Sequence, residues 1–261
     1  MTGNFTDQQV AALQAIRALW PEVRLVLVGA SALAAHKRMH WRRTGDLDLT
    51  VSMSMAEFPA GLESLPGWKR HPMKEHEFTS PLGIKIDVIP AGAEHLAKGY
   101  IEWPSGFRMS LVGLRLAFQG GMPLDDVPGL DIAPLAVIAL LKMGAWQDRP
   151  ADRQRDLEDL GHLLDEYVEP GEDEFYSPIV EELQIEYELI SSFLLGLHIG
   201  RMVNDEERAV AERFLELLDE AGAPHSLMAR LRGWGDDSKQ LTTRLTSLGH
   251  GLRVGNDERT R

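Results

Sequence analysis

The sequence predicts an α/β domain with a mixed sheet and flanking helices, followed by a helical domain. Runs with strand character occur at residues 24–28, 46–51 and 84–89, and helical or turn-forming stretches separate them. From residue 131 onward the apolar residues recur at helical spacing instead. A loop rich in Gly, Pro and Asp precedes this change. We therefore expect two domains, residues 1–125 and residues 126–261.

The composition is that of a globular chain with no membrane partner. The chain has 261 residues, of which 44% are hydrophobic and 26% charged, enough for one large domain or two small ones. It has no cysteine, which excludes disulfides, thiolate zinc sites and cysteine nucleophiles. No run approaches the ~20 apolar residues of a membrane helix, and the first residues do not resemble a signal peptide. We expect a cytoplasmic protein.

Charge is distributed unevenly along the chain. Residues 1–120 carry 13 Lys and Arg against 11 Asp and Glu, whereas residues 121–261 carry 14 against 29, and the net charge is −13. An acidic half argues against broad, unspecific binding of nucleic acid, since that affinity comes mainly from neutralising phosphates. One basic cluster precedes Asp46 and is either a solvated loop or a phosphate contact. Its members are Lys37, Arg38, His40, Arg42 and Arg43.

The segment from residue 6 to residue 40 predicts helix, strand, turn and helix. Thr6 and Gln9 form a capping box at the start of the first helix. After the strand at 24–28, Gly29, Ala30 and Ser31 form a small-residue turn into the next helix. Backbone N–H groups there, with the Ser31 hydroxyl, could receive phosphate oxygens. Such turns are common in α/β proteins, so this one alone indicates little.

Three aspartates stand out on the predicted strands. Asp46 and Asp48 share one face of the strand at 46–51, and neighbouring like charges are unfavourable unless a cation lies between them. Asp87 projects from an apolar strand that should lie inside the sheet. On adjacent strands the three would form an all-oxygen site of the kind Mg²⁺ prefers. The alternatives are an exposed strand entrance for Asp46 and Asp48, and a wet edge strand on which Lys85 accompanies Asp87.

The ordered set of the Gly29 turn, Asp46-x-Asp48 and Asp87 resembles the nucleotidyltransferase superfamily, whose best known member is DNA polymerase beta. Residues 142–149 (KMGAWQDR) and 153–160 (RQRDLEDL) narrow the likeness to the AbiEii/AbiGii toxin group. The resemblance covers residues 20–165. In one departure, Gly-Ala-Ser stands where Gly-Ser or Gly-Gly-Ser/Thr is usual.

The resemblance implies transfer of a nucleoside monophosphate from a triphosphate such as ATP to an acceptor hydroxyl. Asp46 and Asp48 would hold two Mg²⁺ ions about 3.5 to 4 Å apart, with Mn²⁺ as an alternative, and Asp87 would bind the acceptor-side metal. The resemblance also implies a set of nucleotide-binding residues. These are Gly29, Ala30, Ser31, Arg43, Lys142, Arg155 and Asp156.

Two of these positions have simpler explanations. Lys142 lies near the end of an apolar helix and could extend to the surface, whereas the resemblance directs it at the triphosphate. Arg155 and Asp159 are four residues apart and could form an ion pair on one helix face. We expect Asp159 to be structural or to lie just behind the site residues, and we expect His71 and His76 to be surface residues.

The resemblance further implies a tRNA 3′ end as acceptor, and a toxin whose partner is an antitoxin protein. Two alternatives stay open: an acceptor hydroxyl on a small molecule or a protein, and a non-catalytic nucleotide-binding or partner-binding module. Beyond residue 166 we expect helices at 178–200 and 204–221, and a frayed polar tail at 255–261.

Overall fold

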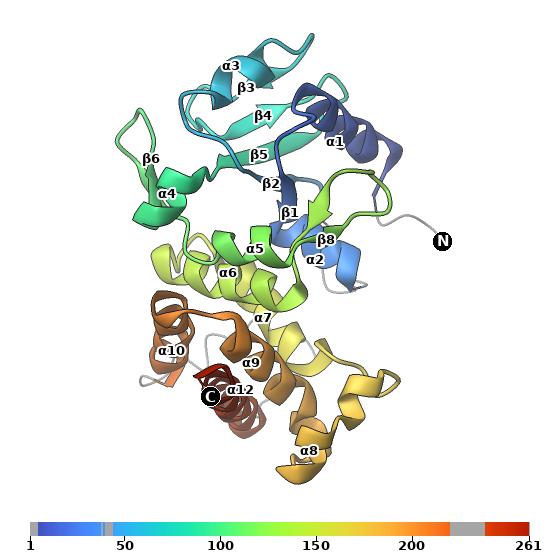
Figure 1. Cartoon of the computed structure of the whole chain (residues 1–261), viewed down its shortest axis with the longest axis vertical. Coiled ribbons are helices and arrows are strands. Elements are labelled where there is room, and N and C mark those ends of the chain that lie inside the picture. Colours follow the sequence, from blue (N-terminus) through green and yellow to red (C-terminus); the bar gives the residue numbers. More distant parts are fainter. Residues whose placement is uncertain (1–4, 38, 40–43, 220–237, 261) are drawn as a thin grey trace. The chain divides into compact units, whose positions relative to one another are not determined.

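The computed structural model describes residues 5–37, 39, 44–219 and 238–260. These residues form two compact units, residues 1–138 and residues 139–261 (Figure 1). The first unit holds the sheet and the second is helical, in agreement with the predicted fold class. The division falls later than residue 125, because β8 (Met122–Pro123) and β9 (Asp131–Ile132) pair into the sheet of the first unit.

The main sheet of the first unit is mixed. Its strand order is β3-β4-β5-β2-β1-β9-β8, with β1–β9 and β2–β5 parallel and the other neighbours antiparallel. The remaining main strands are β1 (Leu25–Val28), β2 (Leu47–Val51), β3 (Lys69–Arg70), β4 (Glu77–Thr79) and β5 (Lys85–Pro90). A separate hairpin consists of β6 (Tyr100–Glu102) and β7 (Arg108–Ser110).

The helices of the first unit are short apart from the first. They are α1 (Asp7–Leu19), α2 (Gly29–His36), α3 (Phe58–Glu63), α4 (Ala93–Lys98) and α5 (Leu114–Gly120). The predicted capping box is present, since Gln9 N donates to Thr6 Oγ1 at 3.2 Å and Thr6 N donates to Gln9 Oε1 at 2.9 Å. Before α3, which begins at Phe58, the backbone N–H and the hydroxyl of Ser54 both donate to Glu57 Oε2 in a turn.

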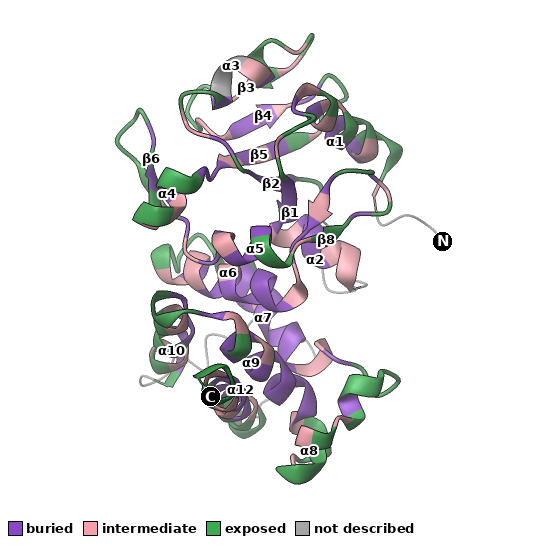
Figure 2. Ribbon diagram, in the orientation of Figure 1, coloured by how far each residue is buried: buried purple, intermediate pink, exposed green. Residues whose placement is uncertain are grey.

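The core of the first unit explains why its central strands are so apolar. Every residue of β1 is buried, as are Leu47 and Leu49 on β2 (Figure 2). Phe58 contacts Phe78 and Trp103 edge-on, with ring centroids 5.8 and 6.1 Å apart. Each such side chain contributes roughly 1.5–3 kcal/mol by leaving water. As predicted, the apolar strand that carries Asp87 lies inside the sheet, between β4 and β2.

The second unit consists of helices, some shorter than expected. α6 (Leu135–Asp148) spans the division, and the others are α7 (Gln154–Glu166), α8 (Pro178–Glu182), α9 (Ile190–Met202), α10 (Asp205–Asp219) and α12 (Ser238–Thr260). The single helix expected at 178–200 is wrong: the chain leaves α8 through Gln184 at a positive φ of 51° and re-enters a helix at α9. The described residues of the unit also include two 3₁₀ turns, η1 (Asp173–Tyr176) and η2 (Tyr187–Leu189).

Helices α9 and α12 are in backbone contact through glycines. A Cβ at Gly196 would overlap the carbonyl oxygen of Leu248, and a Cβ at Gly251 would overlap that of Phe193. Gly200 and Gly255 make the equivalent contacts one turn further along. The frayed tail expected at 255–261 is therefore wrong as far as Thr260, because Gly255 is packed against α9 and the helix continues past it.

Candidate functional site

An acidic row crosses three neighbouring strands of the sheet in the first unit. Asp48 on β2 is the direct partner of Asp87 on β5, and Asp87 is in turn the direct partner of Glu77 on β4. Directly paired residues lie on the same face with their Cβ atoms about 5 Å apart. The structure therefore brings Asp48 and Asp87 side by side, as the sequence predicted, and adds Glu77 beside them. We call Glu77, Asp87 and Asp48 the acidic row.

Gly29 and Ser31 position Asp48. Val28, the last residue of β1, pairs with Asp48, so the turn that follows lies beside this carboxylate. Gly29 has a φ of 67°, and a Cβ there would overlap the Asp48 carboxylate. Ser31 is fully buried, and Asp48 N donates to its Oγ at 3.4 Å. Ser31 thus ties α2 to β2, a structural contact that its predicted role at phosphates did not include.

Asp46 lies just outside this row. It precedes β2 and is exposed, whereas Asp48 is partly buried within the strand. The charges of Asp87 and Asp46 both contribute to the raised pKa of Lys74, after the larger effect of the hydrogen bond to Glu77. The charge of Asp46 therefore acts on the ammonium of Lys74, which forms an ion pair with Glu77 of the acidic row.

An ion pair between Lys74 and Glu77 lies at one end of the acidic row. The sequence did not predict this ion pair. Lys74 Nζ donates to Glu77 Oε2 at 2.7 Å, and the side chain of Glu77 is only 7% exposed. Burial alone would raise the pKa of Glu77, but Lys74 and His71 outweigh burial and hold that pKa below its usual value. Only the strand register shows that Glu77 is opposite Asp87, so a pattern of residue types could not identify it.

His71 and His76 are half-buried beside these acidic groups. His71 Nε2 lies 3.9 Å from Glu77 Oε1, and His71 Nδ1 accepts hydrogen bonds from the backbone N–H groups of Met73 and Lys74. His76 Nε2 lies 3.8 Å from Asp87 Oδ2. Both histidines are half-buried, and His76 is the more deeply buried of the two, so the expectation of ordinary surface histidines holds only in part and mainly for His71.

In the second unit, Lys142 forms a buried ion cluster with two carboxylates. Its Nζ lies 2.8 Å from Asp156 Oδ1 and 2.7 Å from Asp159 Oδ2. Burial alone would lower the pKa of Lys142, but the two carboxylates outweigh it and raise the pKa above its usual value. Asp159 forms an ion pair with Lys142, whereas Arg155, the partner expected from the sequence, is exposed. This contact fits both roles expected for Asp159, a structural role and a position just behind the site residues.

The structure gives less information about the other predicted nucleotide-binding residues. Ala30 is half-buried in the first turn of α2. Arg43 lies outside the described residues, as do Arg38, His40 and Arg42 of the basic cluster. The predictions for Lys142, Arg155 and Asp156 concern the second unit, and those for Asp48 and Asp87 concern the first.

The donor set of Asp48 and Asp87 fits a magnesium ion. Both offer carboxylate oxygens from directly paired positions, and the absence of a side chain at Gly29 leaves room for the Asp48 carboxylate itself. Among the described residues, no group of three or more Asp, Glu, His or Cys side chains converges closely enough to hold a metal ion. Mg²⁺ is typically bound through one or two carboxylates, with phosphate oxygens and water completing its coordination. Two aligned aspartates match that requirement.

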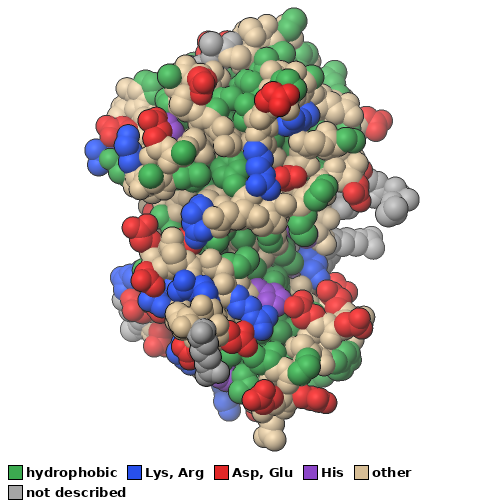
Figure 3. Space-filling model, viewed as in Figure 1, with side chains coloured by type: hydrophobic (Ala, Val, Ile, Leu, Met, Phe, Trp, Pro, Cys, Tyr) green, Lys and Arg blue, Asp and Glu red, His purple; other side chains and the backbone are tan. Residues whose placement is uncertain are grey.

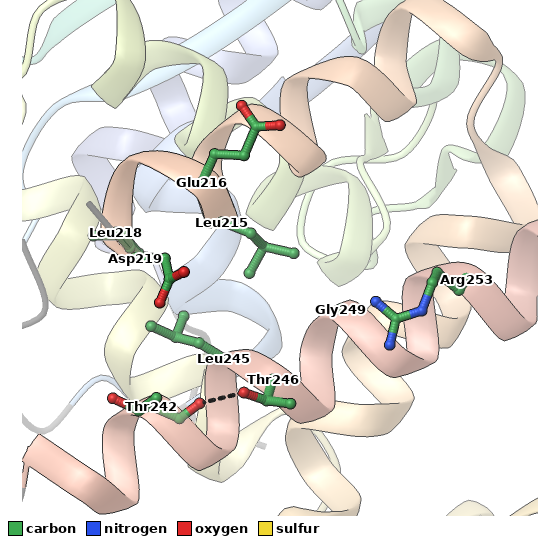
Figure 4. A pocket seen from close by; sticks show the side chains of 9 residues that line it. All are labelled: Leu215, Glu216, Leu218, Asp219, Thr242, Leu245, Thr246, Gly249 and Arg253. Carbon is green, nitrogen blue, oxygen red and sulfur yellow. Dashed lines mark hydrogen bonds between the residues drawn. The ribbon is translucent and has the colours of Figure 1, made fainter. Parts of the chain in front are cut away.

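A cavity in the second unit is lined by none of these residues. It has a volume of about 330 Å³ and opens between α10 and α12 (Figure 4). The described side chains that line it include Leu215, Leu245, Glu216 and Arg253, and none belongs to a predicted site. We assign it no chemistry.

The charged surface is mixed. Among the described residues on the face in Figure 3, Lys and Arg side chains are interspersed with Asp and Glu. None of the described helices is long and apolar enough to cross a membrane.

Comparison with known proteins gives only distant similarity. No protein-family model and no curated protein matches the chain. The chain is similar to the structure of JHP933 from Helicobacter pylori, with a TM-score of 0.40 and 14% identity over 98% of this chain and 95% of that one. It is also similar to an antigenic nucleotidyltransferase-like protein from Paracoccidioides brasiliensis, with a TM-score of 0.43 and 12% identity over 87% and 95%. At these scores the likeness assigns neither a family nor an activity.

Proposed function

We propose that this chain is a metal-dependent nucleotidyltransferase, which moves a nucleoside monophosphate from a triphosphate to an acceptor hydroxyl and releases pyrophosphate. The observation that carries the proposal is the pairing of Asp48 with Asp87 on parallel neighbouring strands, next to the Gly29 turn. This places two carboxylates beside a helix N-terminus whose backbone N–H groups suit phosphate oxygens. A nucleotide and its metal would meet at that edge of the sheet.

In this proposal each group has a separate task. The Gly29 turn and the start of α2 bind the triphosphate, and Asp48 and Asp87 hold Mg²⁺ or Mn²⁺. The metal, when bound, would neutralise charge on the transferred phosphoryl group and favour the ionised acceptor hydroxyl. Holding the two reactants in line accounts for much of the rate enhancement. Asp46 as a ligand of a second ion belongs to the same proposal.

The resemblance to AbiEii/AbiGii toxins extends the proposal to an RNA acceptor, a tRNA 3′ end, and to a toxin neutralised by an antitoxin protein. In that extension Lys142, Arg155 and Asp156 also serve the nucleotide. A hydroxyl on a small molecule or a protein is the alternative acceptor, and a module that only binds nucleotide is the alternative to an enzyme.

The proposal is tested by incubating the protein with each α-labelled triphosphate, Mg²⁺ and total cellular RNA. We expect label in the tRNA fraction, loss of at least about 100-fold in rate for Asp48→Asn, and full inhibition by a chelator that added Mg²⁺ or Mn²⁺ reverses. The matched control is Asp125→Asn, which removes an exposed carboxylate in the loop between β8 and β9. Label found in a protein or a small molecule would support the alternative acceptor. Binding of a triphosphate without transfer of label would contradict the proposal that the chain is an enzyme.

A further inference from the structure

The two ends of the acidic row differ in what lies beyond them. Across the sheet the order is β4-β5-β2-β1, with the Gly29 turn after β1 and Lys74 just before β4. In the proposed function the Gly29 turn receives the triphosphate. An in-line transfer needs the acceptor on the opposite side of the reacting phosphorus. Lys74 therefore lies at the end of the row that is left for the acceptor.

Lys74 is built as a fixed cation and not as a loose surface lysine. Its ammonium donates to Glu77, whose carboxylate is buried on a strand, and its backbone N–H donates to His71 Nδ1 at 3.1 Å. Both ends of the residue are thus held by the fold. A cation that is already positioned loses little freedom when it meets a ligand.

The ammonium can still take a second partner. A lysine has three N–H donors, and Glu77 accepts from Lys74 on one side only. The Lys74 side chain remains 56% exposed, in contrast to 7% for Glu77. Glu77 therefore anchors the charge from below while the outer side of the ammonium remains accessible to an anion.

We infer that Lys74, anchored by Glu77, is a subsite for a backbone phosphate of the RNA acceptor named in the proposed function. This inference rests on the proposed nucleotidyl transfer and deepens it by naming the binding group. A lysine binds phosphate as a point charge, and single-stranded RNA presents a phosphate at every nucleotide. The small positive balance of residues 1–120 is compatible with such a local contact.

The test measures steady-state transfer from labelled triphosphate to unfractionated tRNA, with each substrate varied in turn. Lys74→Met should raise the KM for tRNA about tenfold and leave the KM for triphosphate unchanged, and Lys74→Arg should restore most of the difference. The slope of log KM for tRNA against log salt should fall by about 0.7 to 0.9, the value for one phosphate contact. Glu77→Gln should shift the same parameters in the same direction, since it loosens the anchor.

Lys98→Met is the matched control, because Lys98 is an exposed lysine of the same unit on α4. Circular dichroism of each variant checks that it is folded. If the KM for triphosphate changed and the KM for tRNA did not, Lys74 would contact the triphosphate and not the acceptor, and the inference would be overturned. An unchanged KM and salt slope would overturn it while the proposed function stands. If the wild-type protein labels no RNA, the proposed RNA transferase and the subsite both fail.

Discussion

At the residue scale, the clearest consequence concerns Lys142. Both carboxylates around it are buried, Asp159 completely, so the ammonium compensates two charges at once. Removing one partner of a buried ion pair leaves an uncompensated charge in a medium of low polarity. Loss of activity on mutation of Lys142 would thus be ambiguous between a lost nucleotide contact and a damaged fold.

We predict that Lys142→Met lowers the free energy of unfolding by about 3–5 kcal/mol, measured by urea denaturation. Lys239→Met, which removes an exposed lysine on α12, should change it by less than about 0.5 kcal/mol. Adding Asp156→Asn and Asp159→Asn to Lys142→Met should recover part of the loss, because the two charges are then absent. A loss in Lys142→Met no larger than that of the control would contradict the structural role.

The same scale shows what the sequence could predict. Asp48 and Asp87 were identifiable because each interrupts an apolar strand, and a carboxylate there requires an explanation. Glu77 and Lys74 were not, because a three-residue strand has too little pattern to fix its register. The partner of Asp159 was also missed, since Arg155 is close in sequence whereas Lys142 becomes close only when α6 and α7 pack. The spacing of residues along the sequence predicts which side chains are neighbours on one helix. It does not predict which side chains meet when two helices pack together.

At the element scale, α9 and α12 depend on four glycines. Gly196 and Gly200 on α9, with Gly251 and Gly255 on α12, let two backbones touch. The contacts pair the earlier glycines with each other and the later glycines with each other, so the helices run in the same direction. Sequence periodicity predicted helix over the residues of α9, as part of a longer helix, but it predicted a frayed tail where α12 continues to Thr260. Glycine lowers helix propensity, and the close contact between the two helices had no local signal.

Gly251→Ala should therefore lower the free energy of unfolding by about 1–3 kcal/mol, because the new methyl group forces α9 and α12 apart. Gly249→Ala on the same helix is the control. There the new Cβ meets mainly the flexible end of Leu215 at 3.2 Å. The gain of about 1 kcal/mol in helix propensity should make Gly249→Ala neutral or stabilising. Thermal melting of both variants checks the difference, and equal melting temperatures would show that the backbone contact is not needed.

At the scale of the whole molecule, the position of the division between the units is the main difference from expectation. The loop before residue 131 has the composition of a linker, yet the chain after it returns to the first sheet. Val26 and Leu27 pair with β9, and Arg24 forms an ion pair with Asp131 at 3.0 Å. A two-residue strand such as β9 is too short to be recognised from alternation.

We predict that a chain ending at residue 125 is less stable and less soluble than one ending at residue 138. Loss of β9 would leave β1, an entirely buried and apolar strand, as an unpaired sheet edge, which favours aggregation. Circular dichroism during heating and size-exclusion chromatography compare the two chains directly. If both melt alike and remain monomeric, the first unit does not need residues 126–138.

The glycine beside Asp48 bears on how related sequences are interpreted. In this chain any side chain at position 29 would occupy the space of the Asp48 carboxylate, and the backbone there also has the left-handed conformation that favours glycine. A relative with both aspartates but another residue at position 29 would have a displaced carboxylate. Under the proposed function, replacement of Gly29 would therefore disturb the Asp48 site even when both aspartates are kept.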